Sequence, residues 1–233
     1  MLTAYLNATA NLLQNPAAPN PLYSTANLTT YINTARGQLA GEGQCIRLLG
    51  TFATVIGTRN TPIPTISFSD SEIGGALAVR GLWLNGSAWV QPETWEEYSL
   101  FDLTSDAVGS PARWAQYGSG TIANVFVAPV PDAIYSVEAD CVCYPIPLVD
   151  DSTAEAIPYL WTDAVPYYAA YLALLSAQTG ARTADADKMF ERYQEFVVRA
   201  RVGTTPGVLP WQLPQVPVPG GINPAAAPPS RAA

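Results

Sequence analysis

The sequence predicts an α+β protein. A small helical bundle is formed by N-terminal and C-terminal helices, an antiparallel β-rich domain is inserted between them, and an extended proline-rich arm follows. Three observations support this architecture. Apolar residues recur with a helical period before residue 43 and again over residues 157–202, they alternate with a period of two in between, and eight prolines lie among the last 31 residues. The expected boundaries are residues 1–43, 44–149, 150–202 and 203–233.

The pattern of residues 1–43 predicts two helices. Leu2–Gln14 carries apolar side chains at helical spacing, and a proline-rich turn follows it. Ser24 or Thr25 is placed to cap a second helix, which Gly41 together with Gly43 is expected to end. The apolar stripe of this helix consists of Leu28, Tyr31, Ile32, Ala35 and Leu39.

From residue 44 onward the alternating pattern predicts strands. Asn85-Gly86 between two apolar runs is typical of a two-residue hairpin turn, and Gly118-Ser119-Gly120 marks a second hairpin. Ile66–Phe68 continues the alternating pattern, and Pro92–Tyr98 predicts a short helical turn. The expected strands are Cys45–Leu48, Thr51–Ile56, Leu77–Leu84, Ala88–Val90, Arg113–Tyr117, Thr121–Val127 and Tyr135–Tyr144.

Helical periodicity returns near residue 157. A short turn is expected at Ala156–Trp161, followed by a helix over Asp163–Thr179 that tolerates Pro166 because this proline falls in its first turn. Thr183 or Asp185 is placed to cap the last helix. The stripe of that helix consists of Met189, Tyr193, Phe196, Val197 and Ala200.

Residues 203–233, which we call the C-terminal arm, are too rich in proline for a helix or an interior strand. An extended, partly polyproline II conformation is expected. The arm also carries large apolar residues, so two interpretations stay open, namely a loose terminus and a segment that lies on a partner. These apolar residues are Val208, Leu209, Trp211, Leu213, Val216 and Val218.

Composition and charge restrict the function. Charged residues make up 13% of the chain, against about 25% in ordinary soluble proteins, which favours surfaces that are covered by neighbouring subunits. Residues 42–155 contain four arginines and fourteen acids, a net charge of 4 − 14 = −10, whereas residues 182–201 carry five bases and four acids, or 5 − 4 = +1. Tight binding of nucleic acid requires several Lys and Arg side chains that neutralise phosphates, and Lys188 is the only lysine of the chain. We therefore expect no tight nucleic-acid binding, although DNA can slide past an acidic surface.

No cofactor or metal is expected. The chain contains no histidine, and Cys45, Cys141 and Cys143 lack the spacing of a metal site, so we expect buried reduced thiols. The first fifteen residues do not resemble a signal peptide, and no apolar stretch is long enough for a membrane span. These features agree with production in the cytoplasm.

Catalysis has little support in the residues. Without histidine the common triads and general bases are missing. The carboxylate pairs Glu96-Glu97, Asp150-Asp151 and Asp185 with Asp187 are the residues that a hydrolase would use, but pairs near helix starts also favour the helix dipole. We therefore expect a protein that is not an enzyme.

The order of the parts resembles the head-to-tail adaptor (connector) proteins of tailed bacteriophages, including the tubular tail adaptors of short-tailed phages. The resemblance covers about residues 23–201. It is carried by Leu28–Arg36, by the run from Gln38 to Arg47, by Ser110–Trp114 before a strand, and by the helix pair from Asp163–Ala170 to Phe190–Tyr193.

The resemblance implies a structural virion protein in the neck between head and tail, where a homo-oligomeric ring of twelve copies docks on the portal protein. Such a ring continues the DNA channel without binding DNA specifically, receives a downstream tail protein (nozzle or tail tube), and has no membrane contact. The expected portal-binding arm comprises Leu209, Trp211, Leu213 and Val216. The expected portal-facing helix presents Arg192, Arg199 and Arg201.

Other functions stay open on the sequence. A tail-terminator or stopper ring shares the same residue patterns. A carbohydrate-binding β-module of a tail spike would use Trp83, Trp89, Trp95 or Trp114 as its platform. A hydrolase that uses the acidic pairs is a further alternative.

Overall fold

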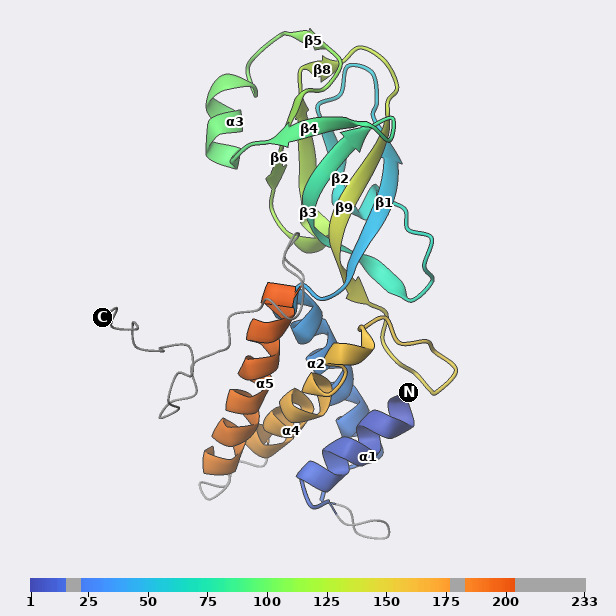
Figure 1. Cartoon of the computed structure of the whole chain (residues 1–233), viewed down its shortest axis with the longest axis vertical. Helices are drawn as coiled ribbons and strands as arrows, with labels where there is room; N and C mark the ends of the chain where they lie inside the picture. The colour runs from blue at the N-terminus through green and yellow to red at the C-terminus, as the bar shows by residue number, and fades with distance from the viewer. Residues whose placement is uncertain (16–21, 177–182, 204–233) are drawn as a thin grey trace, which may run out of the picture.

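The computed structural model describes residues 1–15, 22–176 and 183–203. It is an α+β structure, as predicted, and within the described residues it contains five α-helices and a curled, mostly antiparallel seven-stranded sheet. Figure 1 shows the sheet at one end of the long axis and, at the other end, the helices that come from the two ends of the sequence. The molecule therefore has a strand-rich end and a helical end.

The helical end contains α1 (Leu2–Leu12), α2 (Thr25–Gly43), α4 (Ala164–Ser176) and α5 (Thr183–Gly203). Ser24 caps α2 as predicted, because its hydroxyl accepts a hydrogen bond from the Asn27 N–H at 3.2 Å. The predicted end of α2 at Gly41 together with Gly43 is confirmed. The helix continues to Gly43, which is buried against Ala200 of α5, and Gln44 then takes the left-handed conformation with φ 50°.

Small residues on α4 allow the helices to approach one another closely. Ala169, Ala170 and Ala173 of α4 are fully buried, and α4 contacts α1, α2 and α5. The Tyr193 ring of α5 is fully buried, and its centroid lies 4.6 Å from that of Tyr168 of α4. The apolar stripes that predict the helices are therefore the faces through which the helices pack.

The sheet has the strand order β1-β9-β3-β4-β6-β7-β2. Its curl encloses the core of the strand-rich end, where Leu82, Val90, Val125 and Val137 expose at most 1% of their surface. A separate two-stranded sheet pairs β5 (Val108–Gly109) with β8 (Val130–Pro131). The main strands are β1 (Arg47–Ala53), β2 (Asn60–Pro62), β3 (Ile73–Leu84), β4 (Ala88–Pro92), β6 (Arg113–Tyr117), β7 (Asn124–Ala128) and β9 (Ser136–Pro145).

Both predicted hairpins are confirmed. Strands β3 and β4 pair antiparallel with Leu84 opposite Ala88, so the loop has three residues, Asn85 to Ser87, rather than two. Asn85 and Gly86 take the positive φ angles, 50° and 72°, that favour these residue types in hairpin turns. Strands β6 and β7 pair antiparallel across Gly118, and a 3₁₀ turn at Gly120–Ile122 precedes β7. The long final strand is confirmed as β9.

The structure corrects three predictions in the strand-rich end. The two strands predicted over residues 45–56 are one strand, β1, because Gly50 leaves room for Ile66 and Phe68 to cross it. The segment Ile66–Phe68 forms only a single bridge, between Ser67 and Thr51, rather than a strand. The predicted helical turn is α3 (Trp95–Phe101), which begins later because Thr94 and Glu97 form a capping box.

The sheet is also not purely antiparallel. Strands β4 and β6 pair in parallel, with Gln91 opposite Arg113 and Pro92 opposite Trp114. The connection between them contains α3 and β5, which return the chain to the end of the sheet from which it left. Alternation predicts that a strand exists, but it does not predict its direction relative to a neighbour.

Candidate interaction surfaces

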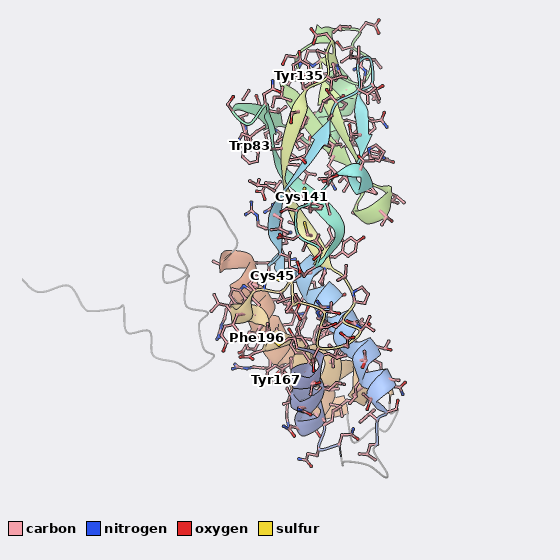
Figure 2. All side chains as sticks on the ribbon, turned by 90° about the vertical axis from the view of Figure 1, so that its right-hand side faces the viewer. Cys45, Trp83, Tyr135, Cys141, Tyr167 and Phe196 are labelled. Atoms are coloured by element: carbon pink, nitrogen blue, oxygen red, sulfur yellow. The ribbon has the colours of Figure 1, made fainter. Side chains whose placement is uncertain are left out.

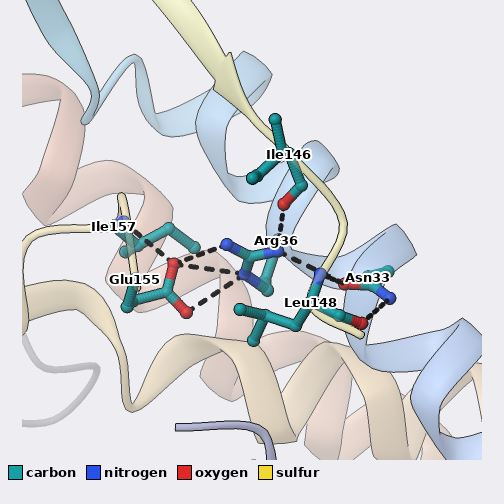
Figure 3. Close-up of polar contacts among 6 residues, drawn as sticks. All are labelled: Asn33, Arg36, Ile146, Leu148, Glu155 and Ile157. Carbon is teal, nitrogen blue, oxygen red and sulfur yellow. Dashed lines mark hydrogen bonds and ion pairs between the residues drawn. The ribbon is translucent and has the colours of Figure 1, made fainter. Parts of the chain in front are cut away.

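A buried ion pair fixes the chain that connects the sheet to α4 against helix α2. Figure 3 shows Arg36 of α2, which is fully buried, directed at Glu155 in the chain between β9 and α4. The Arg36 Nη2 and Nε donate to Glu155 Oε1 at 2.8 and 3.1 Å, and Nη1 donates to the Ile146 carbonyl at 2.7 Å. The Glu155 carboxylate also accepts from the Ile157 N–H at 3.0 Å. The guanidinium thus holds two separate points of the connecting chain.

Asn33, one turn earlier on α2, forms a second set of hydrogen bonds with the connecting chain. Its side-chain amide donates to the Leu148 carbonyl at 3.0 Å, and its side-chain oxygen accepts from the Leu148 N–H at 2.8 Å. Side chains of α2 therefore provide hydrogen-bond partners for the backbone N–H and carbonyl groups where the chain leaves the sheet. The sequence analysis missed this joint. Its only signal was that Asn33 and Arg36 are three residues apart on a helix that has no other charge before Glu42.

The predicted portal-facing arginines do not share one face of α5. At about 100° per residue, Arg192 and Arg199 lie within about 20° of each other, whereas Arg201 lies about 180° from Arg192. Arg201 turns toward α2, where its Nε donates to the Glu42 carbonyl at 2.6 Å. Arg192 pairs with Glu195, and its guanidinium carbon lies 5.4 Å from the centroid of the Phe196 ring. Only Arg192 and Arg199 thus lie on a common outward face.

A groove of about 410 Å³ lies between α1, α4 and α5, and we call it the α1–α4–α5 groove. The Tyr167 and Phe196 rings form a stacked pair in it, with centroids 6.0 Å apart, and Figure 2 labels both rings in the helical end. Its lining consists of Ala8, Asn11, Leu12, Asp163, Pro166, Tyr167, Arg192 and Phe196. One predicted site residue, Arg192, therefore lies in a groove that the sequence did not predict.

The predicted arm residues Leu209, Trp211, Leu213 and Val216 lie outside the described residues. The described chain ends with Gly203, the last residue of α5. A Cβ placed on Gly203 would lie 3.2 Å from the Trp161 ring, so the arm begins beside the start of α4.

A second apolar surface lies at the strand-rich end. We call it the distal loops and define it as residues 54–59, 102–109 and 129–135. Backbone hydrogen bonds tie these loops together, from Gly57 N–H to the Pro131 carbonyl and from Val130 N–H to the Ala107 carbonyl, both at 2.9 Å. Figure 1 shows β5 and β8, which belong to these loops, at the end of the molecule farthest from the helices. Their exposed apolar side chains are Val55, Ile56, Leu103, Val108 and Ile134.

The carboxylate pairs have structural contacts. Glu97 completes the capping box of α3 with Thr94. The Asp151 carboxylate accepts from the Thr3 N–H at 2.9 Å and from its hydroxyl at 2.5 Å, and so caps the first turn of α1. Because α5 begins at Thr183, Asp185 lies within the first turn of α5 and is not its cap. Favourable interactions with helix starts account for Glu97, Asp151 and Asp185, and Asp150 accepts hydrogen bonds from Ser152 in a turn.

The four tryptophans considered for a carbohydrate platform are not gathered on one surface. Trp114 is buried in the core, and Trp95 packs against the rings of Tyr117 and Phe126. Trp83 and Trp89 form an edge-to-face pair across the β3–β4 hairpin, with centroids 5.0 Å apart. Aromatic packing inside the strand-rich end explains most of this set.

The three cysteines are free and buried, as predicted. Cys141 and Cys143 lie on the core-facing side of β9, and Figure 2 shows Cys45 where the two ends of the molecule meet. Burial raises the pKa of each thiol to about 12. In the described ranges, no group of three or more Cys, Asp and Glu side chains is arranged to hold a metal ion. Of the helices that the structure describes, none is long and apolar enough for a membrane crossing.

Comparison with known proteins gives one family. The model of a family described as SU10 adaptor protein matches residues 2–209. The match covers both helical segments, the whole strand-rich end and the first residues of the C-terminal arm. Among curated proteins, none matches the chain.

Proposed function

The chain belongs to the SU10 adaptor protein family, and on this premise we propose that it is the head-to-tail adaptor of a tailed phage. Membership makes the protein a structural phage adaptor and a component of the virion, in contact with other proteins of the head or tail. The proposal adds its place and its assembly. Twelve copies form a ring in the neck, the ring docks on the portal protein, and it continues the DNA channel toward the tail.

One observation carries the proposal: the family match extends over both ends of an elongated molecule. An adaptor has to present different surfaces to a partner above and a partner below. The helical end, with its arm, and the strand-rich end, with its distal loops, are separated along the longest axis of the molecule (Figure 1). The proposal accordingly treats residues 1–43 with 150–202 as one unit and residues 44–149 as another.

We assign the portal to the helical end. The arm residues Leu209, Trp211, Leu213 and Val216 bind the portal, and α5 supports them through Arg192 and Arg199. Arg201 is left out of this contact because it donates to the Glu42 carbonyl within the same chain. A proline-rich arm suits this role, since its restricted backbone loses less entropy when it is ordered on a partner.

We assign the next tail protein, a nozzle or tail tube, to the distal loops. Exposed apolar residues concentrated at one end of a protein are typical of a protein–protein contact. The net charge of −10 over residues 42–155 lets DNA pass the strand-rich end without adhering to it. The proposal includes no reaction, cofactor or membrane contact.

Electron microscopy of the purified chain mixed with the portal protein from the same genome tests the proposal. We expect stacked rings with matching rotational symmetry and one adaptor subunit for each portal subunit. Bare portal rings beside free adaptor chains at micromolar concentrations would contradict it.

Two sets of variants test the assignment of the ends. Deletion of residues 204–233 is expected to weaken portal binding at least tenfold, whereas deletion of residues 220–233 serves as a matched control and leaves it unchanged. Val108→Glu with Ile134→Glu is expected to abolish binding of the next tail protein and to preserve portal binding. If the distal-loop variant instead loses the portal and the arm deletion keeps it, the assigned orientation is reversed.

A further inference from the structure

The α1–α4–α5 groove has the chemistry of a site for an extended, proline-rich segment. Its Tyr167 and Phe196 rings lie at 26° to each other with centroids 6.0 Å apart, and they supply an apolar floor. The Arg192 guanidinium lies over the Phe196 ring, 5.4 Å from its centroid. Proline-rich segments bind in aromatic-lined grooves because their polyproline II backbone is already ordered.

The chain itself contains such a segment directly after α5. Residues 206–219 read PGVLPWQLPQVPVP, with a PxxP pattern at Pro214–Pro217 and a tryptophan at residue 211. A buried tryptophan needs an acceptor for its indole N–H. The groove offers two, the side chains of Asp163 and Asn11.

We infer that the α1–α4–α5 groove binds the chain's own arm, with Trp211 against the Tyr167–Phe196 pair and the flanking residues 208–214 along α1 and α4. This inference goes beyond the proposed function. It concerns the free subunit and stands whether or not the arm later binds a portal.

The path of the chain favours its own arm over that of another copy. Gly203 lies against Trp161, two residues before Asp163 of the groove, so the arm leaves α5 at the end of the groove. Pro206-Gly207 is a turn signal in the sequence, and the inferred path uses it to reverse the chain. A tether of a few residues also gives the arm an effective concentration in the millimolar range.

Distances along the chain agree with this path. Phe196 lies seven residues before Gly203, which is about 10 Å of α-helix, and Arg192 lies about 16 Å before it. From Gly207 to Trp211 there are four residues, which span about 12 Å in a polyproline II conformation. A chain that turns at Pro206-Gly207 therefore brings Trp211 level with Phe196 and Arg192.

Fluorine NMR on the full chain labelled with 5-fluorotryptophan tests the inference. The chain has six tryptophans, and the resonance of Trp211 is assigned by its loss in Trp211→Phe. We expect this resonance to be as broad as that of the folded core and to change less between H₂O and D₂O than that of Trp89, whose side chain is exposed. Dilution is expected to leave it unchanged.

Two groove variants complete the test. Phe196→Ala removes the floor and Ala8→Arg fills the groove from α1, and either is expected to make the Trp211 resonance narrow and at least as solvent-sensitive as that of Trp89. Val198→Ala, an exposed position of α5 outside the groove lining, is the matched control and leaves the resonance unchanged. The buried Trp114 reports that each variant is folded.

Three outcomes would overturn the inference. The first is a narrow, solvent-sensitive Trp211 resonance in the unaltered chain. The second is protection of Trp211 that survives both groove variants. The third is protection that disappears on dilution, which would assign the groove to the arm of a second copy.

Discussion

Arg36 and Glu155 are 119 residues apart in the sequence and form an ion pair with an N–O distance of 2.8 Å, in which the side chains expose only 1% and 9% of their surface. The pair is the centre of the joint between the helical and strand-rich ends, because Arg36 also binds the Ile146 carbonyl as the chain leaves β9. The proposed adaptor, with one partner at each end, needs such a fixed joint, because a loose joint would not keep the two surfaces in a constant relative position.

Arg36→Met is expected to lower the free energy of unfolding by about 3–5 kcal/mol, because it leaves the Glu155 carboxylate buried without its cation. Arg36→Met with Glu155→Leu should recover much of this loss, since no uncompensated charge remains. Lys188→Met is the matched control, because Lys188 and Asp185 form an exposed pair whose loss costs about 0–1 kcal/mol. Urea unfolding followed by circular dichroism measures all three. A single variant within about 1 kcal/mol of the unaltered chain would refute the role of the pair.

Two glycine substitutions are expected to have opposite signs. A Cβ on Gly50 would lie 2.4 Å from Ile66 Cγ2, so Gly50→Ala has to displace the segment that crosses β1 and should cost about 1–3 kcal/mol. A Cβ on Gly37 of α2 meets nothing within 4 Å, so Gly37→Ala should stabilise by about 0.5–1 kcal/mol through helix propensity. Thermal unfolding of the two variants measures the sign of each change in stability. The same sign for both would contradict the packing described for Gly50.

The thiols are expected to be inert in the folded chain. With each thiol pKa raised to about 12 by burial, only about one thiol in 10⁴ is ionised at pH 8. A disulfide-exchange reagent at pH 8 should therefore release almost no colour from the native protein and three equivalents per chain in urea. Rapid labelling of any one cysteine in the native state would show that its burial has been overstated.

Raised thiol pKa values also predict loss of stability in alkali. The folded state keeps its thiol protons, while the unfolded chain releases them above the ordinary pKa of 9.0, so the stabilisation is complete below pH 9 and is lost as the pH rises toward 12. Each thiol contributes at most about 1.4 kcal/mol per pH unit. Burial raises the pKa of Tyr193 as well, and its hydroxyl donates to Glu42 Oε2 at 2.8 Å, which adds to the loss above pH 10.

Urea midpoints at pH 7.5, 9.5 and 10.5 measure this loss. The midpoint should be nearly constant up to pH 8.5 and then fall. Cys141→Ala removes one titrating group and should flatten the decline. A midpoint that is equal at pH 7.5 and pH 10.5 would rule out the proposed linkage.

Local chemistry explains which predictions were correct. Ser24 caps α2 because a hydroxyl next to free N–H groups needs no distant partner, and the Asn85-Gly86 turn forms because these two residues tolerate positive φ angles. The burial of Cys141 and Cys143 follows from alternation along one strand. In each case the interaction is complete within a few residues of chain.

Errors arose where distant residues competed with a local signal. One strand, β1 (Arg47–Ala53), replaces the two predicted over residues 45–56, because Ile66 and Phe68 of another segment cover Gly50. A distant contact also distinguishes the three arginines of α5, because Arg201 donates to the Glu42 carbonyl of α2; the portal contact of these arginines stays a prediction.

The sequence by itself determined the α+β class, the positions of the helices and hairpins, the absence of histidine chemistry and the acidic middle of the chain. Each of these follows from residue type and short-range spacing. Only the tertiary structure decided that Arg36 meets Glu155, that β4 pairs in parallel with β6, and that α1, α4 and α5 leave a groove beside the start of the arm. The physical reason is that these contacts join segments distant in the sequence, 119 residues apart for Arg36 and Glu155. Periodicity shows which face of an element is buried without identifying the element that buries it.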